Sequence, residues 1–100
     1  MTPSKMTLQE YFTPLAGDEV IARANQFFTQ RNTLYAAFPD KRGPGWASFR
    51  GQGGEELIVA AAPVPGGSRV TGSSYLFTMQ VMRFFTTLPA MDAPAPAGVA

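Results

Sequence analysis

The stretch WASFRGQGGEELIVAAAPVPGGSRVT, residues 46–71, decides the fold of this chain. It alternates runs suited to β-strands with short glycine-rich links. The strand-like runs are residues 46–50, 55–61 and 68–72, and the links are residues 51–54 and 63–67. Glycine supplies the positive φ angles that tight reversals need, and links this short leave no room for a crossover helix. The stretch therefore predicts an antiparallel meander.

Three further elements precede this meander. Residues 33–38 are aromatic and end at Pro39, which predicts a strand followed by a loop over 41–45. Residues 6–12 alternate apolar and polar side chains, which predicts a short first strand. Residues 18–31 predict a helix, because their apolar side chains fall on one arc at 100° per residue. The arc consists of Val20, Ile21, Ala24, Phe27 and Phe28.

A second helix is predicted over residues 74–87, with Ser73 or Ser74 as its cap and Pro89 beyond its end. Its apolar side chains form two stripes about 120° apart on the helix surface. The core stripe is Phe77, Val81, Phe84, Phe85 and Leu88, and the outer stripe is Tyr75, Met79 and Met82.

These elements predict one α+β domain over residues 6–89, with an antiparallel sheet of four to five strands and both helices on one face. The order is (β)-α-β-β-β-β-α. Over residues 6–88 it resembles the TATA-binding-protein-like and helix-grip architectures, a resemblance of element order alone. A chain of 100 residues supports one modest core. Residues 1–5 are predicted to be a disordered N-terminus, and residues 90–100 an Ala/Pro-rich disordered tail.

Charge and hydropathy limit the predicted partners. Eight basic and seven acidic residues give a net charge of +1, too little to attract nucleic acid or an anionic membrane. The dispersed Lys41, Arg42, Arg50 and Arg69 make a poor footprint for nucleic acid even with Trp46 nearby. No apolar run approaches the length of a membrane span. We therefore predict a soluble cytoplasmic protein that binds neither nucleic acid nor membrane.

The residue types argue against an enzyme. The chain has no Cys and no His, and its carboxylates are isolated or serve helix ends. Gly72-Ser73-Ser74 lacks the G-x-S-x-G pattern of a nucleophile elbow, so a helix cap explains it better. We predict no catalytic, cofactor-binding or metal-binding residues and no cofactor.

The distribution of apolar residues is the main functional clue. A sheet covered on one side alternates apolar and polar residues, yet residues 57–61 are apolar on both faces. Two helices cover only one face of the predicted sheet. The other face must therefore expose apolar surface or be covered by something else.

Two functions are compatible with this excess. The first is a self-associating interaction module that uses the uncovered sheet face or the outer helix stripe, with Tyr35, Trp46, Tyr75, Met79 and Met82 as candidate interface residues. The alternative is a cavity between the sheet and the second helix that binds an apolar small molecule. Its predicted lining is Phe49, Leu57, Val59, Phe77, Val81 and Phe85. A chain this short leaves little interior space once its large side chains are packed, which favours the interaction module.

Overall fold

The computed structural model describes residues 7–30, 37–51, 53–74 and 77–94, except for the side chain of Gln30. The predicted N-terminus, the last residues of the predicted tail and most of the strand predicted at 33–38 lie outside these ranges. Two candidate interface residues, Tyr35 and Tyr75, lie outside them as well.

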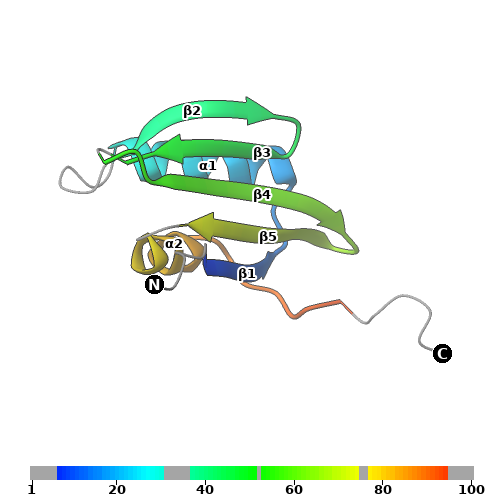
Figure 1. Ribbon diagram of the computed structural model, residues 1–100. Coiled ribbons are helices and arrows are strands. Elements are labelled where there is room, and N and C mark those ends of the chain that lie inside the picture. The colour runs from blue at the N-terminus through cyan, green and yellow to red at the C-terminus, as the bar shows by residue number, and fades with distance from the viewer. Residues whose placement is uncertain (1–6, 31–36, 52, 75–76, 95–100) are drawn as a thin grey trace.

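Five antiparallel strands form one sheet in the order β1-β5-β4-β3-β2 (Figure 1). The strands are β1 (Thr7–Thr13), β2 (Phe38–Gly43), β3 (Trp46–Arg50), β4 (Glu56–Val64) and β5 (Gly67–Ser74). Strands β3 to β5 form the predicted meander, β2 extends it beside β3, and β1 pairs with β5. Strands β1 and β2 are consequently the two edges of the sheet.

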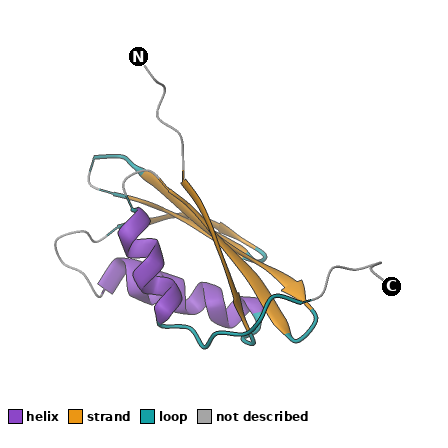
Figure 2. Ribbon diagram, turned by 90° about the horizontal axis from the view of Figure 1, so that it is seen from below, coloured by secondary structure: helices purple, strands orange, loops and turns teal. Residues whose placement is uncertain are grey.

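Helices α1 (Gly17–Gln30) and α2 (Thr78–Thr86) lie on the same side of the sheet (Figure 2). The strands alternate accordingly: in β4, for example, Leu57, Val59 and Ala61 are buried beneath the helices, whereas Ile58 and Ala60 are only half-buried. The predicted α+β fold and its element order are confirmed.

Strand β2 differs from the prediction. The sequence predicts a strand at 33–38 and a loop at 41–45, but β2 extends through Gly43 and only Pro44 and Gly45 form the turn. Proline at the first central position and glycine at φ 77° at the second is the combination of a type II turn. The strand tolerates Pro39 because an edge strand has no neighbour on one side to receive the missing N–H.

The start of α2 was also predicted wrongly. Ser73 and Ser74, the predicted caps, are the last residues of β5, and the N-cap of α2 is Phe77, which has no side-chain capping bond. Both serines pair with β1 on one side and with β4 on the other. Two sets of ladder hydrogen bonds outweigh the single bond that a cap contributes.

The core fills the space between the sheet and both helices. The ring of Phe84 contacts those of Phe27, Phe28 and Phe85, which joins α1 to α2. Strand β5 approaches α2 so closely at Gly72 that a Cβ there would lie 2.7 Å from Val81 Cγ1. The core therefore depends on close aromatic and backbone packing.

The predicted cavity lining lies inside this core. All six side chains are at most 6% exposed and belong to one buried cluster: Phe49, Leu57, Val59, Phe77, Val81 and Phe85. The three pockets described below lie at the margins of this cluster.

The chain that follows α2 returns to β1 (Figure 1). The Tyr11 hydroxyl donates a hydrogen bond to the Leu88 carbonyl at 3.0 Å, and the Met91 N–H donates one to the Phe12 carbonyl at 3.1 Å. The first residues of the predicted tail are thus attached to the C-terminal end of β1.

Candidate interaction site

The face of the sheet turned away from the helices, here called the outer face, is not covered by any element that the structure describes (Figure 2). Strand register places side chains of all five strands on it. They include Leu8, Glu10, Phe12, Phe38, Trp46, Arg50, Glu56, Ile58, Ala60, Ala62, Arg69, Thr71 and Ser73. An uncovered sheet face was predicted from the sequence.

Charged groups on the outer face neutralise one another. Arg69 forms an ion pair with Glu10 of the neighbouring strand. Arg50 Nε lies 3.1 Å from Asp40 Oδ2, and Arg50 Nη2 lies 3.8 Å from Glu56 Oε2. Arg50 and Arg69, two of the four basic residues that the sequence analysis rejected as a nucleic-acid footprint, therefore already have carboxylate partners.

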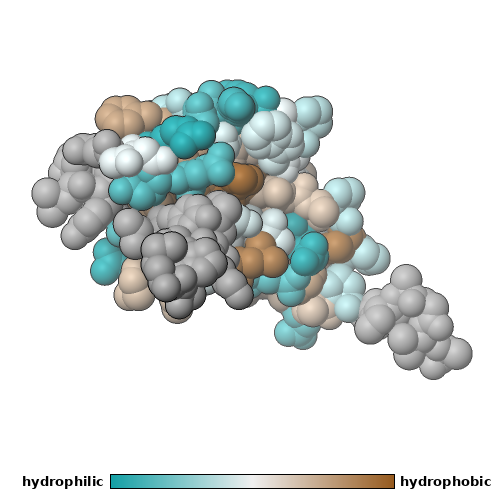
Figure 3. Space-filling view, viewed as in Figure 1, coloured by the Kyte–Doolittle hydropathy of each residue, from teal (hydrophilic) through white to brown (hydrophobic). Residues whose placement is uncertain are grey.

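The most exposed large apolar side chains on the outer face are separated from one another. Leu8 and Phe38 are well exposed on opposite edges, and Trp46 is 36% exposed and lies across Gly43, where a Cβ would be 2.4 Å from its Nε1. Figure 3 looks onto this face and shows brown areas interrupted by teal ones. Monomeric proteins expose scattered apolar groups of this kind, so the outer face by itself does not indicate an interface.

A second surface lies where β1 meets α2. We call it the β1–α2 rim and define it by the free edge of β1 and the flank of α2 turned away from α1. A groove of about 440 Å³ runs along it. The residues that line the groove are Gln9, Glu10, Tyr11, Met82, Phe85 and Thr86.

Methionine dominates the helix side of the rim. Met79 is 61% exposed and Met82 is 51% exposed, and their spacing of three residues places them on one flank. These are the two described members of the predicted outer stripe. Flexible, polarisable methionine side chains suit adaptable contacts with another molecule.

The strand side of the rim offers unpaired backbone. The N–H and C=O of one residue point to the same side of a strand, and the Phe12 carbonyl faces the free edge, where it accepts from Met91. The same groups of Leu8 and Glu10 therefore also face that edge. Among the described residues they have no hydrogen-bond partner.

Gln9 contributes a further unsatisfied group to the rim. Its Nε2 donates to the Thr78 carbonyl at 3.4 Å, whereas its Oε1 is buried and has no hydrogen-bond partner among the described residues. A buried acceptor without a donor costs about 1–3 kcal/mol. A donor in the groove would remove this cost if the Gln9 side chain turned its Oε1 toward it.

The opposite edge of the sheet is protected. Strand β2 contains Pro39, a register shift between Pro39 and Lys41, and exposed charges at residues 40–42. Each of these features discourages pairing with another strand. Strand β1 contains no Pro, Lys or Arg, and its one charge, Glu10, is paired with Arg69.

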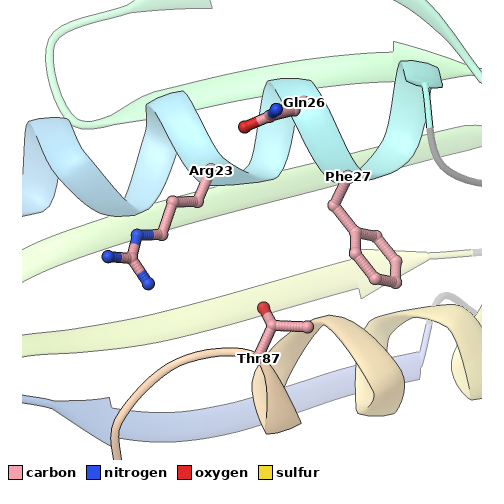
Figure 4. Close-up of a pocket in the computed structure, with 4 residues that line it drawn as sticks. All are labelled: Arg23, Gln26, Phe27 and Thr87. Carbon is pink, nitrogen blue, oxygen red and sulfur yellow. The ribbon is translucent and has the colours of Figure 1, made fainter.

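Two smaller pockets are less suited to binding another molecule. Arg23, Gln26 and Phe27 of α1 and Thr87 after α2 line a pocket of about 210 Å³ (Figure 4). Arg23 Nε lies 2.8 Å from Glu19 Oε2, and the Thr87 hydroxyl donates a hydrogen bond to the Phe84 carbonyl at 2.6 Å. A pocket of about 60 Å³ beneath β2 is too small for more than a few water molecules.

Titratable groups do not gather into a reactive centre in the part of the chain that the structure describes. No group of three or more Asp, Glu, His or Cys residues there is placed to hold a metal ion. Four carboxylates instead form ion pairs with arginines: Glu10, Glu19, Asp40 and Glu56.

Among the helices that the structure describes, none combines the length and the apolar character that crossing a bilayer requires.

Comparison with known proteins adds no assignment. No family model, no curated protein and no solved structure matches the chain.

Sequence reasoning identified Met79, Met82 and Trp46 but missed the backbone of Leu8, Gln9 and Glu10. A signal was present, because residues 7–13 lack the proline and basic residues found in 38–43. That contrast becomes informative only once β1 and β2 are known to be the edge strands.

Proposed function

We propose that this protein is a non-enzymatic interaction module that self-associates through the β1–α2 rim. The observation that carries the proposal is the edge of β1, which pairs with no further strand among the described residues and lies beside the exposed Met82. Met79 is exposed one turn earlier on the same flank of α2. An open edge provides main-chain hydrogen bonds, and the neighbouring apolar side chains provide area to bury.

The rim fits a second copy of the chain better than a charged partner. Among the described residues that line the groove, the one charged side chain is Glu10, and it is paired with Arg69, so this lining does not select a basic or an acidic partner. A two-fold contact places the same backbone groups and the same methionines on both sides, which makes the surface self-complementary.

The expected affinity follows from the size of the rim. One short strand pair and one helix flank bury a total area at or below about 1,200 Å², which is the range of transient complexes. We therefore expect a monomer–dimer equilibrium with a micromolar dissociation constant.

Sedimentation velocity from low micromolar to millimolar concentration tests this proposal, with two matched lysine variants. Met82→Lys places a charge in the rim groove, and Thr71→Lys places the same charge on the outer face, on β5, one strand in from the free edge and opposite Glu10. We expect Met82→Lys to raise the dissociation constant by at least about tenfold, and Thr71→Lys to leave it nearly unchanged.

Thermal unfolding of dilute samples checks that both variants remain folded. A wild-type chain that stays monomeric at millimolar concentration would contradict the proposal. So would a dimer that Thr71→Lys dissociates and Met82→Lys does not, because that pattern assigns the contact to the outer face.

A further inference from the structure

We infer that the two copies join by antiparallel pairing of β1 with β1, with Gln9 opposite Gln9 and Leu8 opposite Glu10 of the partner. This inference rests on the proposed function and specifies the geometry of the same rim. It would make the two sheets one continuous sheet of ten strands, with all four helices on the same side.

The open backbone groups restrict the register. Leu8 and Glu10 face the free edge, so the hydrogen-bonded pairs of the new ladder must involve these residues. When Leu8 pairs with the partner's Glu10, the open backbone groups of both residues form hydrogen bonds in both copies. The two-fold axis then passes between the two Gln9 residues.

The neighbouring registers are less favourable. A shift that places Glu10 opposite Glu10 opposes like charges and pairs Leu8 with the partner's Phe12, whose carbonyl already accepts from Met91. The opposite shift places Leu8 opposite the partner's Leu8. In that register Glu10 no longer pairs with the partner's Leu8. Of the three registers, only the one centred on Gln9 pairs Leu8 with Glu10 in both directions.

Gln9 provides independent support for this centre. Its side chain lies on the helix side of the sheet, in the wall of the groove, and its Oε1 has no donor among the residues that the structure describes. In a non-hydrogen-bonded antiparallel pair the opposing Cα atoms are about 4.5 Å apart. The partner's Gln9 amide can donate to this acceptor once the Gln9 side chain turns toward the groove.

The absence of cysteine from the chain allows a direct test by cross-linking. In the proposed register Gln9→Cys gives two cysteines whose Cα atoms lie within the separation that disulfides accept, about 4.4–6.8 Å. Oxidation with diamide, which accepts the two electrons and two protons, should convert most of this variant to a covalent dimer on a non-reducing gel.

Two control variants define the register. Leu8→Cys and Glu10→Cys should each cross-link poorly alone, because like positions then lie more than about 7 Å apart. An equimolar mixture of the two should give more covalent dimer than either variant alone. Efficient cross-linking of Leu8→Cys by itself, with little from Gln9→Cys, would overturn the proposed register.

Amide hydrogen exchange of the unmodified protein gives a second readout. Exchange at Leu8 and Glu10 should slow at least several-fold from dilute to concentrated samples, while that of Gln9, which already faces β5, should change little. A dimer seen by sedimentation without this protection would refute strand pairing and leave self-association intact. The absence of any dimer would instead refute the proposed function.

Discussion

The two edges of the sheet are treated in opposite ways. Strand β2 combines proline, a register shift and exposed charges, whereas β1 has a regular backbone beside a methionine-lined groove. Proteins ordinarily protect both edges, because an unpaired strand is a template for association with other chains. The difference indicates that protection is applied selectively here, and that the unprotected edge is the one to test.

Support from the helices differs between the edges as well. Helix α1 packs mainly on β4 and also reaches β2 and β3, while α2 packs on β1, where Tyr11 stacks on Phe85 with ring centroids 5.1 Å apart. The open edge is therefore held on the helix side by α2, and its geometry depends on how firmly α2 is anchored to the core.

The largest expected effect comes from breaking that anchor. Phe84→Ala removes a fully buried ring that contacts both helices, so we expect a loss of about 3–5 kcal/mol in the free energy of unfolding. Urea denaturation measures it. Thr86→Ala on the exposed side of the same helix serves as the control and should cost less than about 1 kcal/mol.

Proline substitutions at two adjacent positions of β1 compare an N–H that pairs with β5 and one that faces the free edge. Gln9→Pro removes an N–H that faces β5, and we expect a loss of about 2–3 kcal/mol in unfolding free energy by urea denaturation. Leu8→Pro removes an N–H that faces the free edge, so monomer stability should change by less than about 1 kcal/mol.

Leu8→Pro should act on association instead. Each copy loses one donor to the partner strand, so the dissociation constant measured by sedimentation should rise by at least about tenfold. If Leu8→Pro destabilised the monomer as much as Gln9→Pro does, the assignment of the free edge would be wrong.

The smallest effects concern the surface arginines on the two sides of the outer face. Arg50 contacts Asp40, Glu56 and the Gly54 carbonyl, whereas Arg69 pairs with Glu10. We expect Arg50→Gln to cost about 1 kcal/mol and Arg69→Gln a few tenths, because all these groups are substantially exposed. Equal losses by urea denaturation would show that the additional contacts of Arg50 contribute nothing measurable.

Local pattern predicted most of the fold. The amphipathic helix at α1, the strand at Trp46–Arg50 and the reversals at Gly51–Gly54 and Pro65–Gly66 follow from periodicity and turn chemistry. The errors arose where tertiary pairing overrides local preference. Ser73 and Ser74 suit a helix cap but pair with two strands, and Lys41 and Arg42 suit a loop but fit an edge strand.

The candidate site was predicted only in part, for a physical reason. Exposed methionines can be predicted from helical spacing, because a helix face is defined by nearby residues. An open strand edge is defined by the strand that is missing beside it, which depends on the order of all five strands. Leu8 and Glu10 therefore could not be identified from residue types alone.

The unequal edges also set a limit on assembly size. Pairing β1 with β1 occupies the same edge in both copies, and the ends that remain are two β2 strands with their prolines and charges. A two-fold contact that uses the same edge of both copies stops at a dimer, whereas a head-to-tail contact would continue into a filament. In the proposed dimer, the protected β2 edges would therefore prevent the addition of a third chain.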